Sequence, residues 1–314
     1  MISNFEMVTP LFKSRRTATE HKRKPLVIAH RGASGFAPEN TRAAFKLAVA
    51  LGADGVEMDA QLSADGQVVV IHDARVNRTT NATGPVASFT AAELQQIDAG
   101  EWFGRRLMKR PRLRAALERE AGLVSDNGAR LSVEPVPTLE SVLALLAPAR
   151  LRRIYIEFKG SRAVRHALVE AVISLVRESR MERVVTLLSF DHESVRLAKQ
   201  MADEIRAAAT FSIAGRRLIS ARSIIRAAHS VGADEAALHY GLVTRRTVEA
   251  LHENGIEVSA WTANSRLVMR RLAACGVDSI MTNYPKRLIE TIRSEPPPLL
   301  PVLRADRDSR GSGG

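Results

Sequence analysis

Residues 26–73 read LVIAHRGASGFAPENTRAAFKLAVALGADGVEMDAQLSADGQVVVIHD, and this stretch decides the fold of the chain. An apolar run ends at His30, apolar residues at helical spacing follow over 38–51, and a second apolar run lies over 55–62. A strand, a helix and a strand in this order predict two parallel strands joined by a crossover helix. Acidic, basic and imidazole side chains stand at the ends of the apolar runs, which is where barrel enzymes carry their chemistry.

The third apolar run of this stretch, over 67–73, departs from the alternation. Asp65 and Gly66 separate it from the run before it, and Asp-Gly between apolar runs is the usual hairpin signal. The connection is also too short to contain a crossover helix. We therefore expect residues 67–73 to fold back as an antiparallel arm.

Strand-like and helix-like segments alternate regularly after residue 136. Six further strand-like runs lie over 153–159, 184–190, 204–211, 233–240, 257–264 and 277–285. Helix-like segments lie over 138–146, 163–179, 193–201, 221–231, 245–254 and 267–275, with Thr138 as a candidate N-cap. Without the arm, eight strand–helix units remain, which predicts an α/β fold of the TIM (β/α)8 barrel type with an insertion. An open doubly wound sheet is the alternative, but the Gly-rich dinucleotide turn of that fold is missing.

The segments that flank and interrupt the predicted barrel are irregular. We expect a flexible basic arm over 1–24, one barrel domain over 25–294 and a flexible tail over 295–314 that contains three consecutive prolines. An insertion of about 74–136 follows the His-Asp pair within the barrel domain. It contains one candidate short helix over 89–100 and then an arginine-rich tract.

Composition limits the kinds of partner and compartment. The formal net charge of +12 favours anionic partners, namely nucleic acid, an acidic membrane surface or a phosphate-bearing substrate. The basic tract lacks interleaved aromatic residues, so we expect no nucleic-acid partner, while peripheral contact with an anionic membrane stays open. A membrane-spanning run and a secretory signal are not found, and Cys275 is the single cysteine. These features predict a cytoplasmic protein without an intrachain disulfide.

Three acidic residues stand late in otherwise apolar strand-like runs. Glu57 and Asp59 are two residues apart and therefore share one face of a strand, as do Glu157 and Lys159. The three carboxylates could share one divalent cation, and an all-oxygen set suits Mg²⁺ or Ca²⁺. The alternative is that these acids pair with lysine or arginine and bind no metal.

Histidines and cations stand beside these acids at the predicted strand ends. His30 and His72 could serve as general acid and general base, in an order that the sequence leaves open. Arg31 could bind a phosphate through the forked N–H groups of its guanidinium, and Lys159 through its single charged amine. The alternative is that the two side chains only neutralise Glu39 and Glu157.

Further residues near the predicted strand ends could shape a pocket. The turn over 32–35 could offer backbone N–H groups to an anion, and Trp261 could form a wall of the pocket. Ser189, Phe190 and Asn283 also end strand-like runs and could line the mouth. Serine catalysis is not expected, because the sequence contains no G-x-S-x-G elbow.

The motifs carrying these residues resemble those of the glycerophosphodiester phosphodiesterases, a family of phospholipase C-like TIM barrels. The resemblance covers about residues 26–292 and rests on several motifs in the family's order. They are AHRGASGFAPENTRAAF, GVEMDAQLSADGQVVVIHD, VPTLESVLALL, YIEFK, LLSF, AWTAN and GVDSIMTNYP.

The resemblance implies a metal-dependent phosphoric diester hydrolase that releases an alcohol and sn-glycerol 3-phosphate in glycerophospholipid breakdown. It further implies that a glycerol hydroxyl of the substrate attacks first and that water opens the resulting cyclic phosphate. The residues that match the family's site are His30 and His72 for acid–base catalysis, Glu57, Asp59 and Glu157 for the metal, Arg31 and Lys159 for the phosphate, Trp261 near the glycerol, and Glu39 and Asn40 in support.

The arginine-rich insertion is where the chain departs from the family pattern. The family passes in a short step from its WF motif to its PTLE motif, whereas here Trp102-Phe103 and the 137–140 motif are far apart. This length leaves substrate preference open. Alternatives are a lysophospholipase D or sphingomyelinase D-like enzyme on the same fold, and a non-catalytic protein that binds anionic lipid or nucleic acid. The oligomeric state is not predicted.

Overall fold

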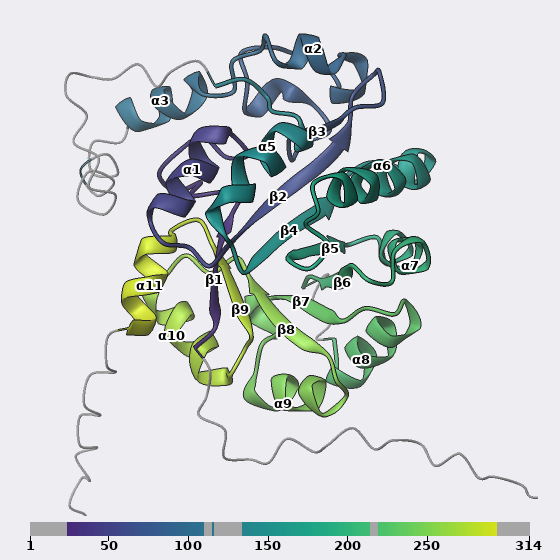
Figure 1. Cartoon of the computed structure of the whole chain (residues 1–314). Coiled ribbons are helices and arrows are strands. Elements are labelled where there is room, and N and C mark those ends of the chain that lie inside the picture. Colours follow the sequence, from purple (N-terminus) through teal and green to yellow (C-terminus); the bar gives the residue numbers. More distant parts are fainter. Residues whose placement is uncertain (1–23, 110–114, 116–133, 214–218, 294–314) are drawn as a thin grey trace, which may run out of the picture.

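Eight parallel strands close into a barrel in the computed structural model, which describes residues 24–109, 115, 134–213 and 219–293 (Figure 1). The strands are β1 (Leu26–His30), β2 (Gly55–Leu62), β4 (Arg153–Phe158), β5 (Val185–Ser189), β6 (Arg206–Phe211), β7 (Glu235–His239), β8 (Glu257–Trp261) and β9 (Ser279–Thr282). Each strand pairs with its neighbour around the ring, and β1 closes the ring by pairing with both β9 and β2. The predicted TIM barrel is confirmed.

The predicted antiparallel arm is present but shorter than expected. Strand β3 (Val68–Val70) pairs antiparallel with β2, with Val70 opposite Ala60, and the turn between them places Gly66 at a φ of 76°. His72 and Asp73 therefore follow the strand and do not belong to it. Gln61 of β2 holds the end of the arm by donating from Nε2 to the carbonyls of Ile71, His72 and Asp73.

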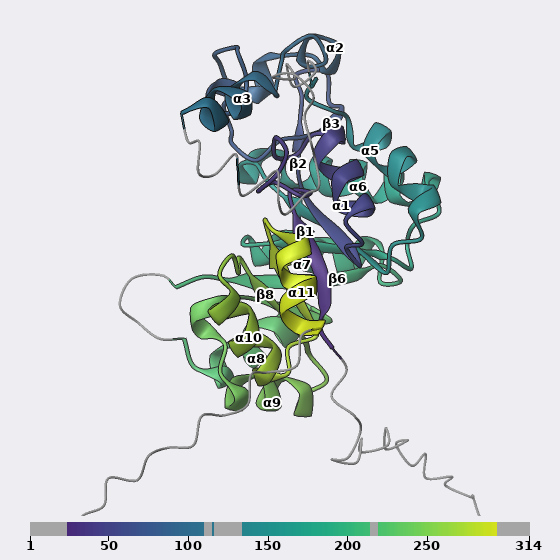
Figure 2. The ribbon, with the colours of Figure 1, turned by 90° about the vertical axis from the view of Figure 1, so that its left-hand side faces the viewer.

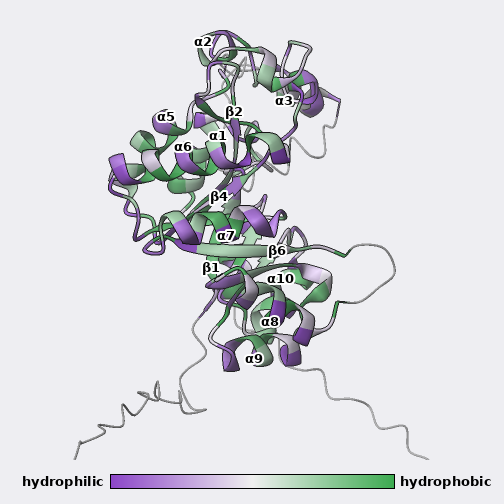
Figure 3. Cartoon of the chain, turned by 90° about the vertical axis from the view of Figure 1, so that its right-hand side faces the viewer, coloured by the Kyte–Doolittle hydropathy of each residue, from purple (hydrophilic) through white to green (hydrophobic). Residues whose placement is uncertain are grey.

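Helices cover the outside of the barrel (Figures 1 and 2). They are α1 (Arg42–Ala50), α5 (Leu139–Leu146), α6 (Arg165–Glu178), α7 (His192–Met201), α8 (Ala221–Ser230), α9 (Arg245–Glu253), α10 (Arg266–Cys275) and α11 (Pro285–Arg293). Two large apolar clusters fill the space between strands and helices, while polar residues face outward on the helices (Figure 3). None of the described helices combines the length and apolar character needed to cross a membrane.

Capping side chains set the helix starts. The Thr41 hydroxyl accepts a hydrogen bond from the Ala44 N–H, so α1 begins at Arg42. The prediction of a helix from residue 38 was wrong, because residues 38–41 form a turn that leads into this cap. Thr138 caps α5 in the same way through the Ser141 N–H, as predicted.

Residues 74–109 of the insertion pack as a small unit beyond the end of β2 (Figure 2). It contains the 3₁₀ turns η1 (Val76–Arg78) and η2 (Val86–Ser88), the predicted short helix α2 (Ala91–Leu94), and a helix that was not predicted, α3 (Glu101–Met108). Its own apolar cluster includes Val76, Val86 and Leu94. The arginines at 110, 112 and 114 and the expected tail over 295–314 lie outside the described residues, as does the expected arm apart from Lys24.

The barrel interior is filled at the N-terminal ends of the strands. Arg153 and Glu235 form an ion pair there at 3.2 Å, and the Tyr155 hydroxyl donates a hydrogen bond to Glu235 at 2.9 Å. An apolar layer follows above them, formed by Ile28, Tyr155, Leu188, Ala208, Ala237 and Met281. Because side chains fill this end, a ligand can approach the interior from the C-terminal ends of the strands.

Gly32, directly after β1, lets the chain turn tightly against α1. Its φ is 75°, and a Cβ built there would lie 2.7 Å from the backbone of Ala44. We expect Gly32→Ala to lower the free energy of unfolding by roughly 2–4 kcal/mol, since it adds an overpacked contact to an unfavourable φ. Urea denaturation measures this loss.

The matched control is Gly66→Ala, which has a similar φ of 76° but open space around the added Cβ. It should cost roughly 1 kcal/mol through backbone strain alone. Equal losses in the two variants would show that the contact with α1 is not what requires a glycine at position 32.

Candidate active site

A cavity of about 150 Å³ opens at the C-terminal ends of the barrel strands. This volume is far larger than the roughly 10–15 Å³ that one water molecule needs. Seven of the predicted site residues line it, namely His30, Arg31, Glu57, His72, Glu157, Lys159 and Trp261. Asp59, Glu39 and Asn40 do not line the cavity but contact Arg31, which does, Asn40 through its backbone N–H.

Three buried carboxylates lie close together at the site. Strand register places Asp59 opposite Glu157, and the period of two residues puts Glu57 on the same face as Asp59. One ligand oxygen from each of the three residues lies within 4.8 Å of the others. The Oε1 atom of Glu57 and the Oδ1 atom of Asp59 are buried and have no hydrogen-bond partner among the described residues. This all-oxygen donor set fits a hard divalent cation.

Crowding of these carboxylates shifts their protonation. Burial, with the neighbouring Asp59 and Glu157, raises the pKa of Glu57 well above its ordinary value. Burial also raises the pKa of Glu157 to about 7, against the opposing charge of Lys159. Burial alone would raise the pKa of Asp59, but Arg31 and Lys159 outweigh it and the net shift is downward. Crowding and burial thus disfavour the charged forms of Glu57 and Glu157, and a cation bound among the three carboxylates would stabilise these charged forms.

Two cationic side chains contact the carboxylates. Arg31 lies at 3.2 Å from Asp59 through Nε and donates from Nη1 to Glu39 at 2.7 Å. Lys159 Nζ lies at 2.5 Å from Glu157 and at 3.4 Å from Asp59. Both cations thus make ion pairs with acids of the site, as the alternative interpretation expected, and both also line the cavity where an anion could bind.

The two histidines are held differently. His30 Nδ1 pairs with the Oδ1 atom of Asn283 at 2.8 Å, and its Nε2 lies at 3.8 Å from Glu57. Burial, with the nearby charge of Arg31, lowers the pKa of His30 to about 4. His72 Nδ1 pairs with the Asp73 carboxylate at 2.6 Å. One imidazole is therefore oriented by a neutral amide and the other by a carboxylate.

Aromatic side chains form one wall of the cavity. Trp261 donates from Nε1 to the Ala237 carbonyl at 3.1 Å, which fixes its ring. Phe190 packs edge-on against it, with ring centroids 5.3 Å apart, and is 46% exposed. Phe190 lines the cavity as expected for a strand-end residue, whereas Ser189 is buried and donates to the Phe158 carbonyl.

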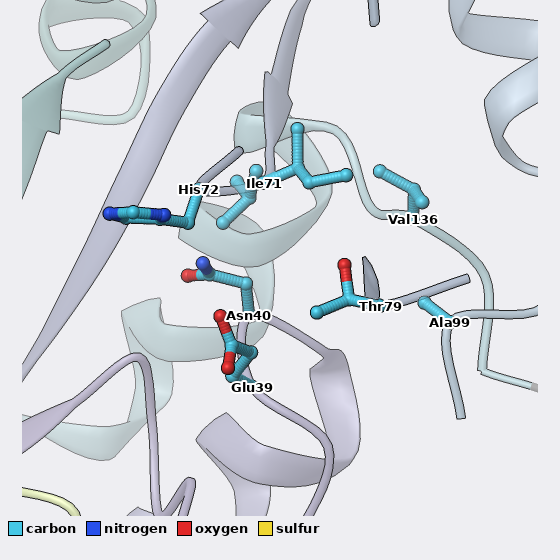
Figure 4. Close-up of a pocket in the computed structure, with 8 residues that line it drawn as sticks. Glu39, Asn40, Ile71, His72, Thr79, Ala99 and Val136 are labelled. Atoms are coloured by element: carbon cyan, nitrogen blue, oxygen red, sulfur yellow. The ribbon is translucent and has the colours of Figure 1, made fainter. Parts of the chain in front are cut away.

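Glu39 and Asn40 support the site from below His72. Asn40 is buried at a φ of 59° and donates from Nδ2 to Asp59 at 2.7 Å. Figure 4 shows Glu39, Asn40 and His72 on one side of a second, small cavity of about 10 Å³, with residues of the arm and insertion on the other. This is room for about one water, so the seam between barrel and insertion is tightly packed.

The turn over 32–35 does not offer N–H groups to an anion, contrary to the prediction. Its four N–H groups donate to backbone carbonyls of the chain, those of Ala29, Ala44, Gly32 and Asn283 in order. The backbone N–H of Arg31 donates to Glu57 at 2.9 Å. The turn therefore holds β1 against α1 and β9.

Two residues that contact the predicted site residues were not themselves predicted. Asp73 orients His72, and its place in the His-Asp pair was a usable signal. Arg78 contacts both Asp73 and Glu39, and nothing in its local sequence indicates this. Asn283, expected only to line the mouth, bonds His30.

Known proteins show the same fold and sequence pattern. The profile of the "Glycerophosphoryl diester phosphodiesterase family" matches residues 30–287. A glycerophosphodiester phosphodiesterase of Caldanaerobacter subterraneus subsp. tengcongensis is 36% identical over 273 residues, covering 86% of this chain and 98% of that protein. The crystal structure of a glycerophosphodiester phosphodiesterase from Agrobacterium tumefaciens aligns with a TM-score of 0.67 and 30% identity over 85% of this chain and 99% of the other.

An Oleispira antarctica phosphodiesterase, solved in complex with the product sn-glycerol-3-phosphate, aligns with a TM-score of 0.71. It is 26% identical and covers 86% of this chain and 98% of its own. The profile match spans most of the chain and includes the residues that converge on the barrel mouth. The chain therefore belongs to the glycerophosphoryl diester phosphodiesterase family.

Proposed function

We propose that this chain hydrolyses glycerophosphodiesters to an alcohol and sn-glycerol 3-phosphate, as a step of glycerophospholipid breakdown. The observation that carries the proposal is the convergence of two imidazoles, two cations and the carboxylates of Glu57 and Glu157 at one cavity, with the Asp59 carboxylate beside them. Family membership supports the same reaction, as does the product bound by the Oleispira relative.

Glu57, Asp59 and Glu157 would hold the divalent cation, Mg²⁺ or Ca²⁺. Their mutual proximity supports this assignment, as does the buried Oε1 atom of Glu57, which has no hydrogen-bond partner among the described residues. When bound, the cation supplies neutralising charge for the phosphodiester and for the charge that develops during cleavage. Arg31 and Lys159 contribute further positive charge at the same cavity and would contact the phosphate oxygens.

His30 and His72 would share the proton transfers. The amide oxygen of Asn283 accepts from His30 Nδ1, which leaves Nε2 free to take the proton of the attacking hydroxyl. The Asp73 carboxylate accepts from Nδ1 of His72, which leaves Nε2 of His72 to donate a proton to the leaving alkoxide as its bond to phosphorus breaks. Water then opens the cyclic phosphate while the two histidines exchange roles. Trp261 would form the wall beside the glycerol.

The proposal is tested by release of sn-glycerol 3-phosphate from a small panel of glycerophosphodiesters, with and without added Mg²⁺ or Ca²⁺. We expect stoichiometric release of the alcohol and metal-dependent turnover. A glycerol analogue without the neighbouring hydroxyl should not turn over. Its normal hydrolysis would refute internal attack, and no release from any diester would refute the function.

Lipid cleavage on the same site is the second candidate. Val164, Phe190 and Ile213 are exposed apolar residues that follow β4, β5 and β6, and Phe190 lines the cavity. Such residues at a mouth suit a lysophospholipase D or sphingomyelinase D-like enzyme at a lipid surface. Turnover of glycerophosphocholine compared with that of a lysophospholipid in micelles separates the two, and faster micelle cleavage would favour the lipid enzyme.

A further inference from the structure

Arg78 is a residue of the insertion whose side chain reaches the barrel mouth. It ends the 3₁₀ turn η1, which is anchored by buried Val76 and by the hydrogen bond from the Val76 N–H to the Gly84 carbonyl. The Thr80 hydroxyl also donates to the Val76 carbonyl at 2.8 Å. The backbone that carries Arg78 is therefore fixed within the insertion.

The guanidinium of Arg78 bridges two carboxylates from different parts of the chain. Nε and Nη2 donate to Asp73 at 2.6 and 3.1 Å, and Nη1 and Nη2 donate to Glu39 at 3.0 and 2.8 Å. These contacts hold the pKa of Asp73 well below its ordinary value. Two bidentate pairs on one arginine give a defined geometry that a single surface ion pair lacks.

Each of these carboxylates also holds a residue of the proposed chemistry. Asp73 accepts from Nδ1 of His72, and Glu39 accepts from Nη1 of Arg31. Without a cation between them, Asp73 and Glu39 would repel each other, and each could leave its partner. Arg78 itself does not belong to the residues that line the 150 Å³ cavity.

We propose that Arg78 is a positioning residue that aligns His72 through Asp73 and Arg31 through Glu39. One side chain of the insertion thereby positions both an acid–base residue, His72, and a phosphate-binding residue, Arg31. This inference rests on the proposed function, because it assigns an effect on turnover to a residue that does not touch the substrate.

The kinetic test compares Arg78→Met with Arg75→Met. Arg75 is exposed three residues earlier and makes no side-chain hydrogen bond or ion pair within the described part of the chain. We expect Arg78→Met to lower kcat/KM by about 10–100-fold, the usual effect of removing a partner that orients a site residue. Arg78→Lys keeps the positive charge but loses the forked guanidinium, so its kcat/KM should lie between those of the wild type and Arg78→Met. The kcat/KM of Arg75→Met should equal that of the wild type. Equal effects of Arg78→Met and Arg75→Met would overturn the proposal.

A second comparison excludes a merely structural role. In a chain that already carries Asp73→Asn and Glu39→Gln, the added Arg78→Met should cause no further loss, since no carboxylate remains for it to align. A further loss of the full size in that background would contradict the proposal.

Imidazole ¹⁵N NMR on histidine-labelled protein gives a readout that does not depend on turnover. At an alkaline pH, where the imidazoles are neutral, the wild type should show His72 with its proton on Nδ1, and the signal is assigned through His72→Gln. Arg78→Met should show a mixture of His72 tautomers, while His30 stays unchanged. An unaltered His72 tautomer in Arg78→Met would overturn the positioning role. If the wild type cleaves no diester, the proposed function fails, and this spectrum still decides whether Arg78 aligns His72.

Discussion

Replacing His30 or His72 by alanine is expected to lower kcat by about 10²–10⁴-fold, because each variant removes one partner of the proton transfer. Both rings line the cavity, and each is oriented through Nδ1 by a separate partner, Asn283 or Asp73. The measurement is the initial rate of glycerophosphodiester hydrolysis at saturating substrate and metal. Thermal unfolding of the same samples checks that the variants remain folded.

His166→Ala is the matched control, because this histidine is 70% exposed on α6. Its kcat should equal that of the wild type. Near-normal kcat in His30→Ala or His72→Ala would remove that residue from the mechanism. His30 and His72 are predicted to act together in the proton transfers. The kcat of the double alanine variant should therefore be only slightly below that of the less active single variant.

Removal of the cation is expected to reduce turnover by about 10²–10⁴-fold, corresponding to several kcal/mol of lost charge stabilisation. EDTA should cause this loss, and added Mg²⁺ or Ca²⁺ should restore the rate. Glu57→Gln should cause a similar loss that metal does not restore, because a buried ligand oxygen and its charge are gone. Calorimetric titration with Mg²⁺ should show weakened binding in the same variant.

Glu170→Gln, on exposed α6 surface, is the control and should leave both metal binding and turnover unchanged. Full activity in excess EDTA would contradict the metal role of the three acids. The same experiment separates the enzyme from a charge-driven binding protein, whose anion binding would survive EDTA and weaken with salt.

The strand periodicity made much of the site predictable. Alternation by two residues placed Glu57 with Asp59 and Glu157 with Lys159, and the parallel barrel brought these pairs side by side. His30 was predictable because it ends β1, which pairs in register with Glu57. The family and the barrel followed from the order of motifs and the count of strand–helix units, and both are confirmed.

The features of the site that the sequence did not indicate depend on contacts between segments that are far apart in the chain. Arg78 lies 39 residues after Glu39, and only the packing of the insertion against the mouth brings the two together. The turn over 32–35 contains small residues typical of anion sites, but its N–H groups bond to neighbouring segments that no local pattern identifies. Helix α3 was missed because its arginines resemble an irregular basic tract.

The proposed chemistry depends most directly on where a cation binds. Crystals of the chain grown with Mn²⁺ and sn-glycerol 3-phosphate would locate the ion by its anomalous scattering. We predict one strong peak among the carboxylates of Glu57, Asp59 and Glu157, with the phosphate of the product beside the imidazoles of His30 and His72. Metal or product bound elsewhere, with this cluster held only by Arg31 and Lys159, would contradict the account.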